Sequence, residues 1–175
     1  YYGFILSFLG LFGVNSSKSE SQFFKIENIL KFSKVSELKL KPLQKIEFDS
    51  NFAELNRLIK NKKYESDKYF FVTNNGRWTG FIDENILKTV SIKKWERHFV
   101  GDFKKPIDSF ESVYANDKLW KTIERIEETG KGFILVLNSA DIPLGIIDRS
   151  KIGNFVLNKL GFNLPSEIVN KLNYK

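Results

Sequence analysis

The sequence contains no cysteine and no methionine, and its single histidine is His98. Without cysteine it can form neither a disulfide framework nor a thiolate metal site. A His-Glu-x-x-His motif, which holds zinc between two histidines on one helical face, is excluded as well. His98 lies three residues after Trp95 and is interpreted as a surface or interface residue. No metal site is therefore predicted in this chain.

Signatures of other enzyme classes are also missing. The sequence has no glycine-rich phosphate loop and no nucleophile elbow of the Gly-x-Ser-x-Gly type. Acidic residues are frequent, but none are placed as a pair of catalytic acid and base. The row formed by Glu124, Glu127 and Glu128 is typical of the solvated face of a helix. We predict that the chain has no catalytic residues of its own.

Positive charge is in excess, because 28 Lys and Arg stand against 21 Asp and Glu and give a net charge of +7. A basic chain can bind nucleic acid or an anionic membrane surface. Most of the basic residues are lysines, however, whereas proteins that read bases favour arginine for its bidentate contacts. The prediction is that nucleic acid is not a partner. A soluble, basic, nucleic-acid-binding module is kept as an alternative.

One stretch of the sequence occurs twice. Trp78–Asp83 reads Trp-Thr-Gly-Phe-Ile-Asp, and Pro143–Asp148, 65 residues later, reads Pro-Leu-Gly-Ile-Ile-Asp. Each copy predicts a short apolar strand that ends at an aspartate able to cap a helix. The same register aligns Val35–Leu38 with Val100–Phe103, Tyr69–Val72 with Ile134–Leu137, Asn51 with Asn116, Leu55 with Trp120 and Leu58 with Ile123, while Pro42 and Pro106 slip by one residue.

The repeat predicts an α+β fold made of two β-α-β-β-α units, because an internal period sets the architecture of a chain. The 175-residue chain is long enough for one domain of ordinary size or two small intertwined ones, and its 42% hydrophobic residues supply ample material for a core. We assign residues 34–92 to the first unit, 93–162 to the second and 163–175 to a tail helix.

Each unit is expected to contain a strand, a helix, a hairpin and a second helix. In the hairpin of the first unit, Asn74-Asn75-Gly76 predicts a tight turn, because Asn-Gly tolerates positive φ angles. The expected strands are 46–48, 69–73, 78–82, 110–113, 133–137 and 142–147. The first helix is expected to start at Asn51, with Glu54 in the capping-box position. The other helices are expected to run from Asp83 to about Val90, from Asn116 to Gly130 and from Asp148 to Leu160.

The beginning of the chain is apolar. Residues 1–14 carry no charge and include three glycines, which are common in membrane helices, although a span needs roughly 20 apolar residues. We interpret this run as the end of a truncated membrane helix, and a buried helix or strand of a soluble domain is the alternative. Residues 15–33 are assigned to a linker and an amphipathic helix, and their lysines predict that the rest of the chain is cytoplasmic. Since the chain has no Met and begins with Tyr1, we expect it to be a piece of a longer protein.

Two such units, each with Gly-apolar-apolar before its last helix, resemble a tandem CBS-domain pair, also called a Bateman module. The resemblance covers about residues 33–160 and rests on the period, on Val35 and Val100 at the entry of each unit, and on Gly80 and Gly145. It implies units that pack sheet to sheet with nucleotide clefts between them. It also implies a module without catalysis that senses adenosine nucleotides and biases an attached enzyme, channel or transporter.

Family members that bind nucleotide carry Gly-apolar-apolar-Thr/Ser-x-x-Asp, in which the hydroxyl contacts phosphate and the aspartate holds the ribose. In this sequence the hydroxyl positions are Asp83 and Asp148, and the ribose positions are Ile86 and Lys151. A capping aspartate fills the anion site of a helix N-terminus with its own carboxylate, and Ile86 accepts no hydrogen bond. These four residues and Arg149 are the candidate ligand-binding positions. The departures predict weak or absent binding of adenine nucleotides and no cofactor in this chain.

An apolar run, lysines and then a CBS-like pair resemble the C-terminal region of site-2-protease-like membrane zinc metalloproteases of the cyanobacterial kind. The run from Tyr2 to Asn15 resembles the last membrane helix of that group. The resemblance implies a membrane-attached, cytoplasmic regulatory module whose partners are the attached protease domain and a second copy of the chain, with the zinc in the parent enzyme. The other alternative is a nucleotide sensor with a rearranged site at Arg77, Arg149 and Lys151.

Overall fold

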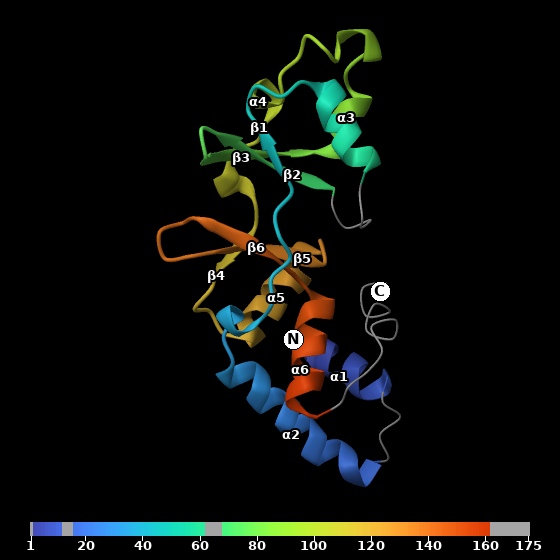
Figure 1. Ribbon diagram of the computed structural model, residues 1–175. Helices are drawn as coiled ribbons and strands as arrows, with labels where there is room; N and C mark the ends of the chain where they lie inside the picture. The colour runs from blue at the N-terminus through green and yellow to red at the C-terminus, as the bar shows by residue number, and fades with distance from the viewer. Residues whose placement is uncertain (1, 12–15, 62–67, 162–175) are drawn as a thin grey trace. The chain divides into compact units, whose positions relative to one another are not determined.

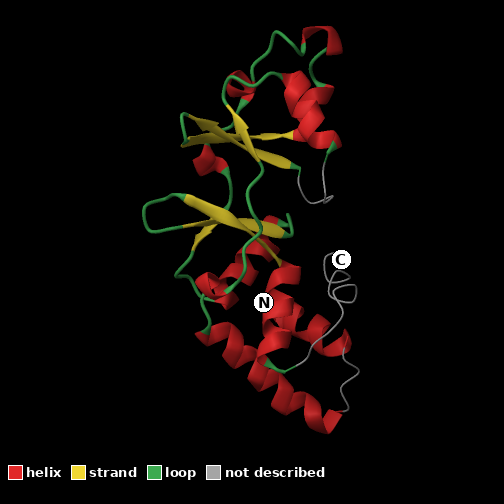
Figure 2. Ribbon diagram, viewed as in Figure 1, coloured by secondary structure: helices red, strands yellow, loops and turns green. Residues whose placement is uncertain are grey.

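The computed structural model describes residues 2–11, 16–61 and 68–161 (Figure 1). The chain divides into two compact units. Pro42–Phe110 forms one, called here the middle unit; Tyr1–Lys41 and Glu111–Lys175 together form the other, called the terminal unit. Each unit contains a three-stranded sheet and helices (Figure 2), so the predicted α+β class is confirmed.

The middle unit is built on a sheet with the strand order β1-β2-β3. Strands β1 and β2 are parallel and are joined through helix α3, as parallel neighbours require a crossover, while β2 and β3 form an antiparallel hairpin. The elements, with η for a 3₁₀ helix, are β1 (Lys45–Glu47), α3 (Phe52–Lys60), β2 (Tyr69–Asn74), β3 (Arg77–Asp83), η2 (Glu84–Lys88), η3 (Ile92–Lys94), α4 (Val100–Phe103) and η4 (Ile107–Ser109).

Two local predictions for the middle unit are confirmed. The side-chain oxygen of Asn51 caps α3 by accepting a hydrogen bond from the N–H of Glu54 at 3.0 Å. The β2–β3 hairpin turns at Asn75 and Gly76, whose φ angles are 50° and 77°. These are the positive values that a two-residue hairpin of type I′ requires. The cap and the turn place α3 and β3 where the apolar pattern expects them.

The helix after β3 differs from the prediction. Asp83 does cap it, but the helix is the five-residue 3₁₀ helix η2, which ends at Lys88 rather than near Val90. The carboxylate of Asp83 accepts a hydrogen bond from the N–H of Asn85 at 2.8 Å, two residues on, which favours a tight turn over an α-helical one. At the other end the hydroxyl of Thr89 donates to the carbonyl of Ile86 at 2.8 Å and stops the helix.

The core of the middle unit lies between one face of its sheet and helix α3. Alternate residues of the strands point to this face, as the two-residue period of a strand requires. The buried side chains of this core are Ile46, Phe52, Leu55, Phe70, Val72, Ile82 and Val100.

The terminal unit contains the matching sheet, with the order β4-β5-β6, and four α-helices within its described residues. Strands β4 and β5 are parallel, and β5 and β6 are antiparallel. The elements are α1 (Tyr2–Leu11), α2 (Ser16–Phe32), η1 (Val35–Glu37), β4 (Ser112–Tyr114), α5 (Leu119–Thr129), β5 (Phe133–Leu137), β6 (Pro143–Asp148) and α6 (Arg149–Lys159).

The predicted ends of two helices in this unit are confirmed. Helix α5 stops at Gly130, whose φ of 63° is the left-handed conformation that glycine adopts at helix C-termini. Helix α6 starts after Asp148, which accepts a hydrogen bond from the N–H of Lys151. The amphipathic helix predicted within residues 15–33 is also present, as α2, and it buries Ile26 and Leu30.

The start of the second repeat is a correction. Helix α5 begins at Leu119 and not at Asn116, and β4 occupies Ser112–Tyr114 rather than 110–113. Asn116 is exposed in a turn, which the carboxylate of Asp117 closes by accepting the N–H of Tyr114 at 2.8 Å. This aspartate turn uses the residues that would otherwise form the first turn of the helix.

The single 65-residue register holds only for part of the repeat. Gly80 and Gly145 lie opposite equivalent residues of β2 and β5, so the last strand keeps the period. The first strands begin at Lys45 and Ser112 and the first helices at Phe52 and Leu119, in both cases 67 residues apart, so the added residues precede β4, in the segment that contains η4. Three of the predicted alignments are therefore wrong by two residues: Asn51 with Asn116, Leu55 with Trp120 and Leu58 with Ile123. The alignment of Tyr69–Val72 with Ile134–Leu137, in strands β2 and β5, is wrong by one residue.

The N-terminal helix α1 packs on the protein core. Phe4 and Ile5 are 6% and 0% exposed and join the apolar cluster that contains Ile26 and Leu30 of α2. Within residues 2–11, 16–61 and 68–161, no helix is both long and apolar enough to cross a bilayer. Phe4 and Ile5 are thus buried in protein, whereas Leu6 of the same helix is 63% exposed, and membrane attachment stays a prediction. The predicted tail helix at 163–175 lies outside the described residues.

Candidate functional site

The segment that leads into each repeat packs on the strands of the other repeat. Val35–Lys41 precedes the first repeat but belongs to the terminal unit, and Val100–Lys105 precedes the second repeat but belongs to the middle unit. The first N–H of each segment donates to a backbone carbonyl, that of Asp117 at 3.0 Å and that of Ser50 at 2.8 Å. Both units are therefore built in the same way, from exchanged entry segments.

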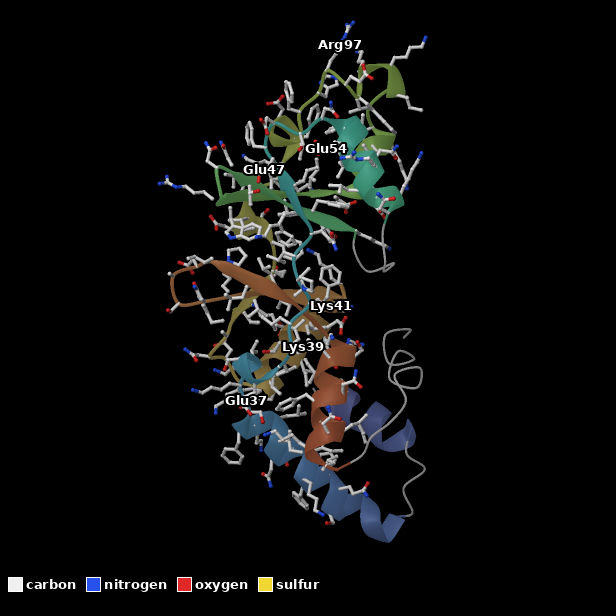
Figure 3. All side chains as sticks on the ribbon, viewed as in Figure 1. Glu37, Lys39, Lys41, Glu47, Glu54 and Arg97 are labelled. Atoms are coloured by element: carbon white, nitrogen blue, oxygen red, sulfur yellow. The ribbon has the colours of Figure 1, made fainter. Side chains whose placement is uncertain are left out.

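The entry segment of the terminal unit ends beside β6. The N–H of Lys41 donates to the carbonyl of Ile146 and the N–H of Ile146 donates to the carbonyl of Lys41, both at 2.9 Å. Gly145 makes this approach sterically feasible, because a Cβ built on it would lie 2.6 Å from the Lys41 carbonyl oxygen. Figure 3 shows Lys41 on this segment, beside β6 and the start of α6.

The middle unit repeats the arrangement at the equivalent residues. Lys105 and Phe81 exchange two backbone hydrogen bonds of 2.8 and 2.9 Å, and a Cβ on Gly80 would overlap the carbonyl oxygen of Lys105. Each of these lysines precedes a proline, Pro42 or Pro106, which holds the residue before it in an extended conformation. The glycine of the repeated motif is thus required by a close approach of two backbones and not by a ligand.

Asp148 is the most densely bonded of the predicted site residues. It is 5% exposed and lies at the N-terminus of α6. One carboxylate oxygen accepts the hydroxyl of Ser150 at 2.6 Å and the N–H of Lys151 at 2.9 Å. The other oxygen forms an ion pair with the ammonium group of Lys41 at 2.5 Å. Both oxygens are therefore committed to groups of the protein itself.

The charge state of Asp148 is set by these contacts. Burial by itself raises the pKa of the carboxyl group, because it disfavours the charged form. The hydrogen bonds from Lys41, Ser150 and the N–H of Lys151, together with the positive charge of Lys41, outweigh burial and lower the pKa below its usual value. Asp148 is therefore a carboxylate at neutral pH, and it places a negative charge at the start of α6.

Arg149 and Lys151 are the first and third residues of α6 and are both half-buried. A helix N-terminus binds anions through its free N–H groups, but the N–H of Lys151 already donates to Asp148. A phosphate at this position would compete with the Asp148 carboxylate for the same donor and meet its negative charge at short range. The structure therefore brings Asp148, Arg149 and Lys151 together at one helix end, as a closed cap.

The equivalent position in the middle unit is different. Asp83 is half-buried and caps η2 by accepting hydrogen bonds from the N–H and the side-chain amide of Asn85, both at 2.8 Å. Ile86 packs partly buried against the core of the unit. Neither residue offers a free donor for a phosphate or an acceptor for a ribose hydroxyl. The two motif copies thus share a capping aspartate and differ in the helix it caps.

Sequence reasoning missed Lys41 and Ser150, the two side chains that hold Asp148. Ser150 lies two residues after the motif, where a hydroxyl commonly bonds to a capping aspartate. Lys41 was harder to find, because it lies 107 residues before its partner. The available signal was the pair of Lys-Pro dipeptides at Lys41 and Lys105, since both lysines end an entry segment.

The single histidine has a packing role. The ring of His98 lies 5.4 Å from that of Phe103 and 6.3 Å from that of Phe52, measured between ring centroids. It is partly buried, in agreement with its interpretation as a surface or interface residue. Among the residues that the structure describes, no group of three His, Cys, Asp or Glu could hold a metal ion.

Aromatic rings gather on the face of β2 and β3 that is opposite the middle-unit core. The ring of Phe110 lies 5.1 Å from Tyr69 and 4.8 Å from Phe81, and both pairs meet edge to face. Burial, followed by the nearby charge of Asp83, raises the pKa of the Tyr69 hydroxyl group. This cluster stabilises the sheet, because aromatic pairs of this geometry attract beyond the area they bury.

Comparisons with known proteins were made for sequence and for structure. No protein-family model matches the sequence, and a search of curated proteins found no match. Solved structures do match. The CBS domain of the bacterial CNNM/CorC family Mg²⁺ transporter is 12% identical, covers 92% of this chain and 94% of its own, and superimposes with a TM-score of 0.60. The chain has the fold of CBS-domain proteins.

Two further structures support the assignment of the CBS fold. A hemolysin-like protein containing a CBS domain from Oenococcus oeni PSU is 14% identical, with a TM-score of 0.53 over 75% of this chain and 95% of that chain. CBSX2, solved in complex with AMP, is 19% identical, with a TM-score of 0.54 over 73% of this chain and 98% of that chain. At these identities the likeness is one of fold, and it confirms the predicted CBS pair at that level.

Proposed function

We propose that this chain is a non-catalytic regulatory CBS-pair module that acts through contacts with an attached protein and not by binding an adenine nucleotide. The closed cap at Asp148 is the observation that carries the proposal. A phosphate at the start of α6 would have to displace a carboxylate that accepts hydrogen bonds from Ser150 and Lys151 and pairs with Lys41. Displacing it would also break the ion pair with Lys41, whose side chain is 25% exposed.

The first motif copy leads to the same proposal for a different reason. Its helix, η2, is a 3₁₀ helix of five residues, so it presents few aligned N–H groups to an anion. Ile86 occupies the position where nucleotide-binding relatives carry the ribose aspartate, and its side chain packs against the apolar core. Neither copy therefore supplies the phosphate donor and the ribose acceptor together.

The parent protein is part of the proposal. The apolar run at 1–14, the lysines after it and the CBS fold support a module at the cytoplasmic C-terminal end of a site-2-protease-like membrane zinc metalloprotease. The reading frame upstream of Tyr1 tests this directly. A His-Glu-x-x-His motif within predicted membrane spans supports the parent; an upstream frame that encodes a transporter or a soluble domain rejects it and leaves the regulatory module in place.

An adenine-nucleotide sensor with a rearranged site is the second candidate. The observation that favours it is the AMP in the solved structure of CBSX2, which shares the fold. Such a site would use Arg149 and Lys151, which lie together at the start of α6, for the phosphates. A soluble, basic, nucleic-acid-binding module has no comparable support in the structure.

Thermal unfolding in the presence of ligands separates these functions. The full chain is melted with and without millimolar ATP, ADP, AMP and S-adenosylmethionine, and CBSX2 with AMP serves as the positive control. A ligand at 100 times its dissociation constant stabilises the folded state by about 2.7 kcal/mol, which is about 5 °C or more in a chain of this size. We expect less than about 1 °C with every ligand. A saturable shift, lost in Arg149→Ala and Lys151→Ala, would establish the sensor instead.

A further inference from the structure

Helix α2 carries two large apolar side chains that point away from the protein. Phe24 is 54% exposed and Phe32 is 73% exposed, although the same helix buries Ile26 and Leu30 in the core. With 3.6 residues per turn, Phe24, Asn28 and Phe32 form a single stripe on the outer face of the helix. A soluble surface rarely repeats exposed phenylalanines along one stripe, because each keeps apolar area in water.

Basic side chains flank this stripe. Lys25 and Lys31 are exposed on either side of it, and Lys34 lies just beyond the end of the helix. Glu27 lies one turn after Phe24 and pairs with Lys31 at 2.8 Å, and its side chain is only 14% exposed. The described outer face of α2 therefore combines phenyl rings with positive charge and presents no exposed acidic side chain.

The neighbouring helix extends the apolar character of this region. Helix α1 contains no charged residue and packs against α2. Its residues Gly3, Leu6 and Gly10 are exposed, and Leu6 reaches 63%. In Figure 1 helix α2 lies along the outside of the terminal unit, and the sheet of that unit does not cover it. The two packed helices thus expose phenylalanine, leucine and glycine together with lysine.

We propose that the outer face of α2 binds the surface of an anionic lipid bilayer, with Phe24 and Phe32 inserted at the level of the acyl chains and Lys25 and Lys31 at the headgroup phosphates. Helices that lie in a membrane interface combine aromatic or leucine side chains with lysine in this way. Charge complementarity favours lipid over a second copy of the chain, because two copies of this face would bring the same lysines together. The site is separate from any attachment through residues 1–14.

Vesicle co-sedimentation of the full chain tests the proposal. The vesicles are made of phosphatidylcholine alone or of phosphatidylcholine mixed with phosphatidylglycerol. We expect binding to the mixed vesicles, weakened by added salt, because salt screens the attraction between lysine and phosphate. Phe24→Ser with Phe32→Ser should lower the partition coefficient by about tenfold per ring, and Lys25→Gln with Lys31→Gln by about fivefold per lysine.

Matched variants distinguish this face from the rest of the chain. Ile92, 74% exposed beside Lys93 and Lys94, is the control, and Ile92→Ser with Lys93→Gln should bind vesicles as the native chain does. Circular dichroism confirms that each variant is folded. Equal binding by the native chain and the phenylalanine variant would overturn the proposal and assign the binding to another segment. Absence of binding, or a dimer that the same variant abolishes, would overturn it in favour of a protein contact.

Discussion

The ammonium group of Lys41 lies 2.5 Å from the carboxylate of Asp148, which caps helix α6. The two residues are 107 positions apart in the sequence, and their side chains are 25% and 8% exposed. Lys41 also exchanges two backbone hydrogen bonds with Ile146, so its main chain and its side chain bind the same end of β6. This relationship fixes the entry segment to the second repeat and closes the helix N-terminus at the same time.

The first prediction concerns the cap. Asp148→Ala should destabilise the chain by about 2–4 kcal/mol, because it removes the helix cap and the ion pair with the half-buried Lys41. Asp83→Ala is the matched control, since Asp83 caps a short 3₁₀ helix near the surface, and it should cost only about 0.5–1 kcal/mol. Urea unfolding followed by tryptophan fluorescence measures both. Equal losses in the two variants would contradict the role given to Lys41.

The second prediction concerns pH. The contacts of Asp148 lower its pKa in the folded state below the ordinary value of 3.8. The carboxylate therefore contributes stability at any pH above that value, and this contribution is lost as the pH falls through the folded-state pKa. Asp148→Asn removes the titratable carboxyl group and keeps a side chain that can cap the helix. The difference in unfolding free energy between the native chain and this variant should be constant above about pH 5 and should shrink below about pH 4.

The third prediction concerns the two motif glycines. Gly145→Ala and Gly80→Ala should each cost about 2–4 kcal/mol, because the added Cβ overlaps a backbone carbonyl that cannot move without breaking the Lys41–Ile146 or Lys105–Phe81 bridge. Gly10→Ala is the control, because a Cβ at Gly10 meets no atom within 4 Å and alanine favours a helix. It should be neutral or stabilise by up to about 1 kcal/mol. Thermal and urea melts of the three variants provide the comparison.

The repeat could be predicted from the sequence because its strands follow strong local rules. Asn75 and Gly76 form the hairpin turn and Gly130 ends α5, because these residues adopt positive φ angles. Asp148 starts α6 because its side chain caps the helix. These features need only neighbours in the chain. The CBS fold results from two copies of such a unit, and the solved structures confirm it.

Other features depend on contacts that the sequence does not display. The two-residue shift of the second repeat is already present at β4, because the segment with η4 adds residues before that strand. Asn116 looks like a cap but lies in the turn that Asp117 closes. The entry segments exchange between repeats, and no local pattern near Lys41 identifies Ile146 as its partner. The apolar run that includes Phe4 and Ile5 predicts burial, but hydropathy alone does not distinguish a bilayer from a protein core.

The last prediction isolates the ion pair itself. Lys41→Met keeps the backbone bridge to Ile146 and removes only the ammonium group, while Asp148→Asn keeps the cap on Lys151 and removes only the charge. If the pair stabilises the fold, the two changes together should cost less than the sum of the single changes, and a double-mutant cycle should give a coupling energy of about 1–3 kcal/mol. The same cycle at Glu54 and Arg57, an exposed pair 3.7 Å apart, should give about 0.5 kcal/mol or less. A coupling at Lys41–Asp148 as small as in this control would mean that the backbone bridge alone holds the entry segment.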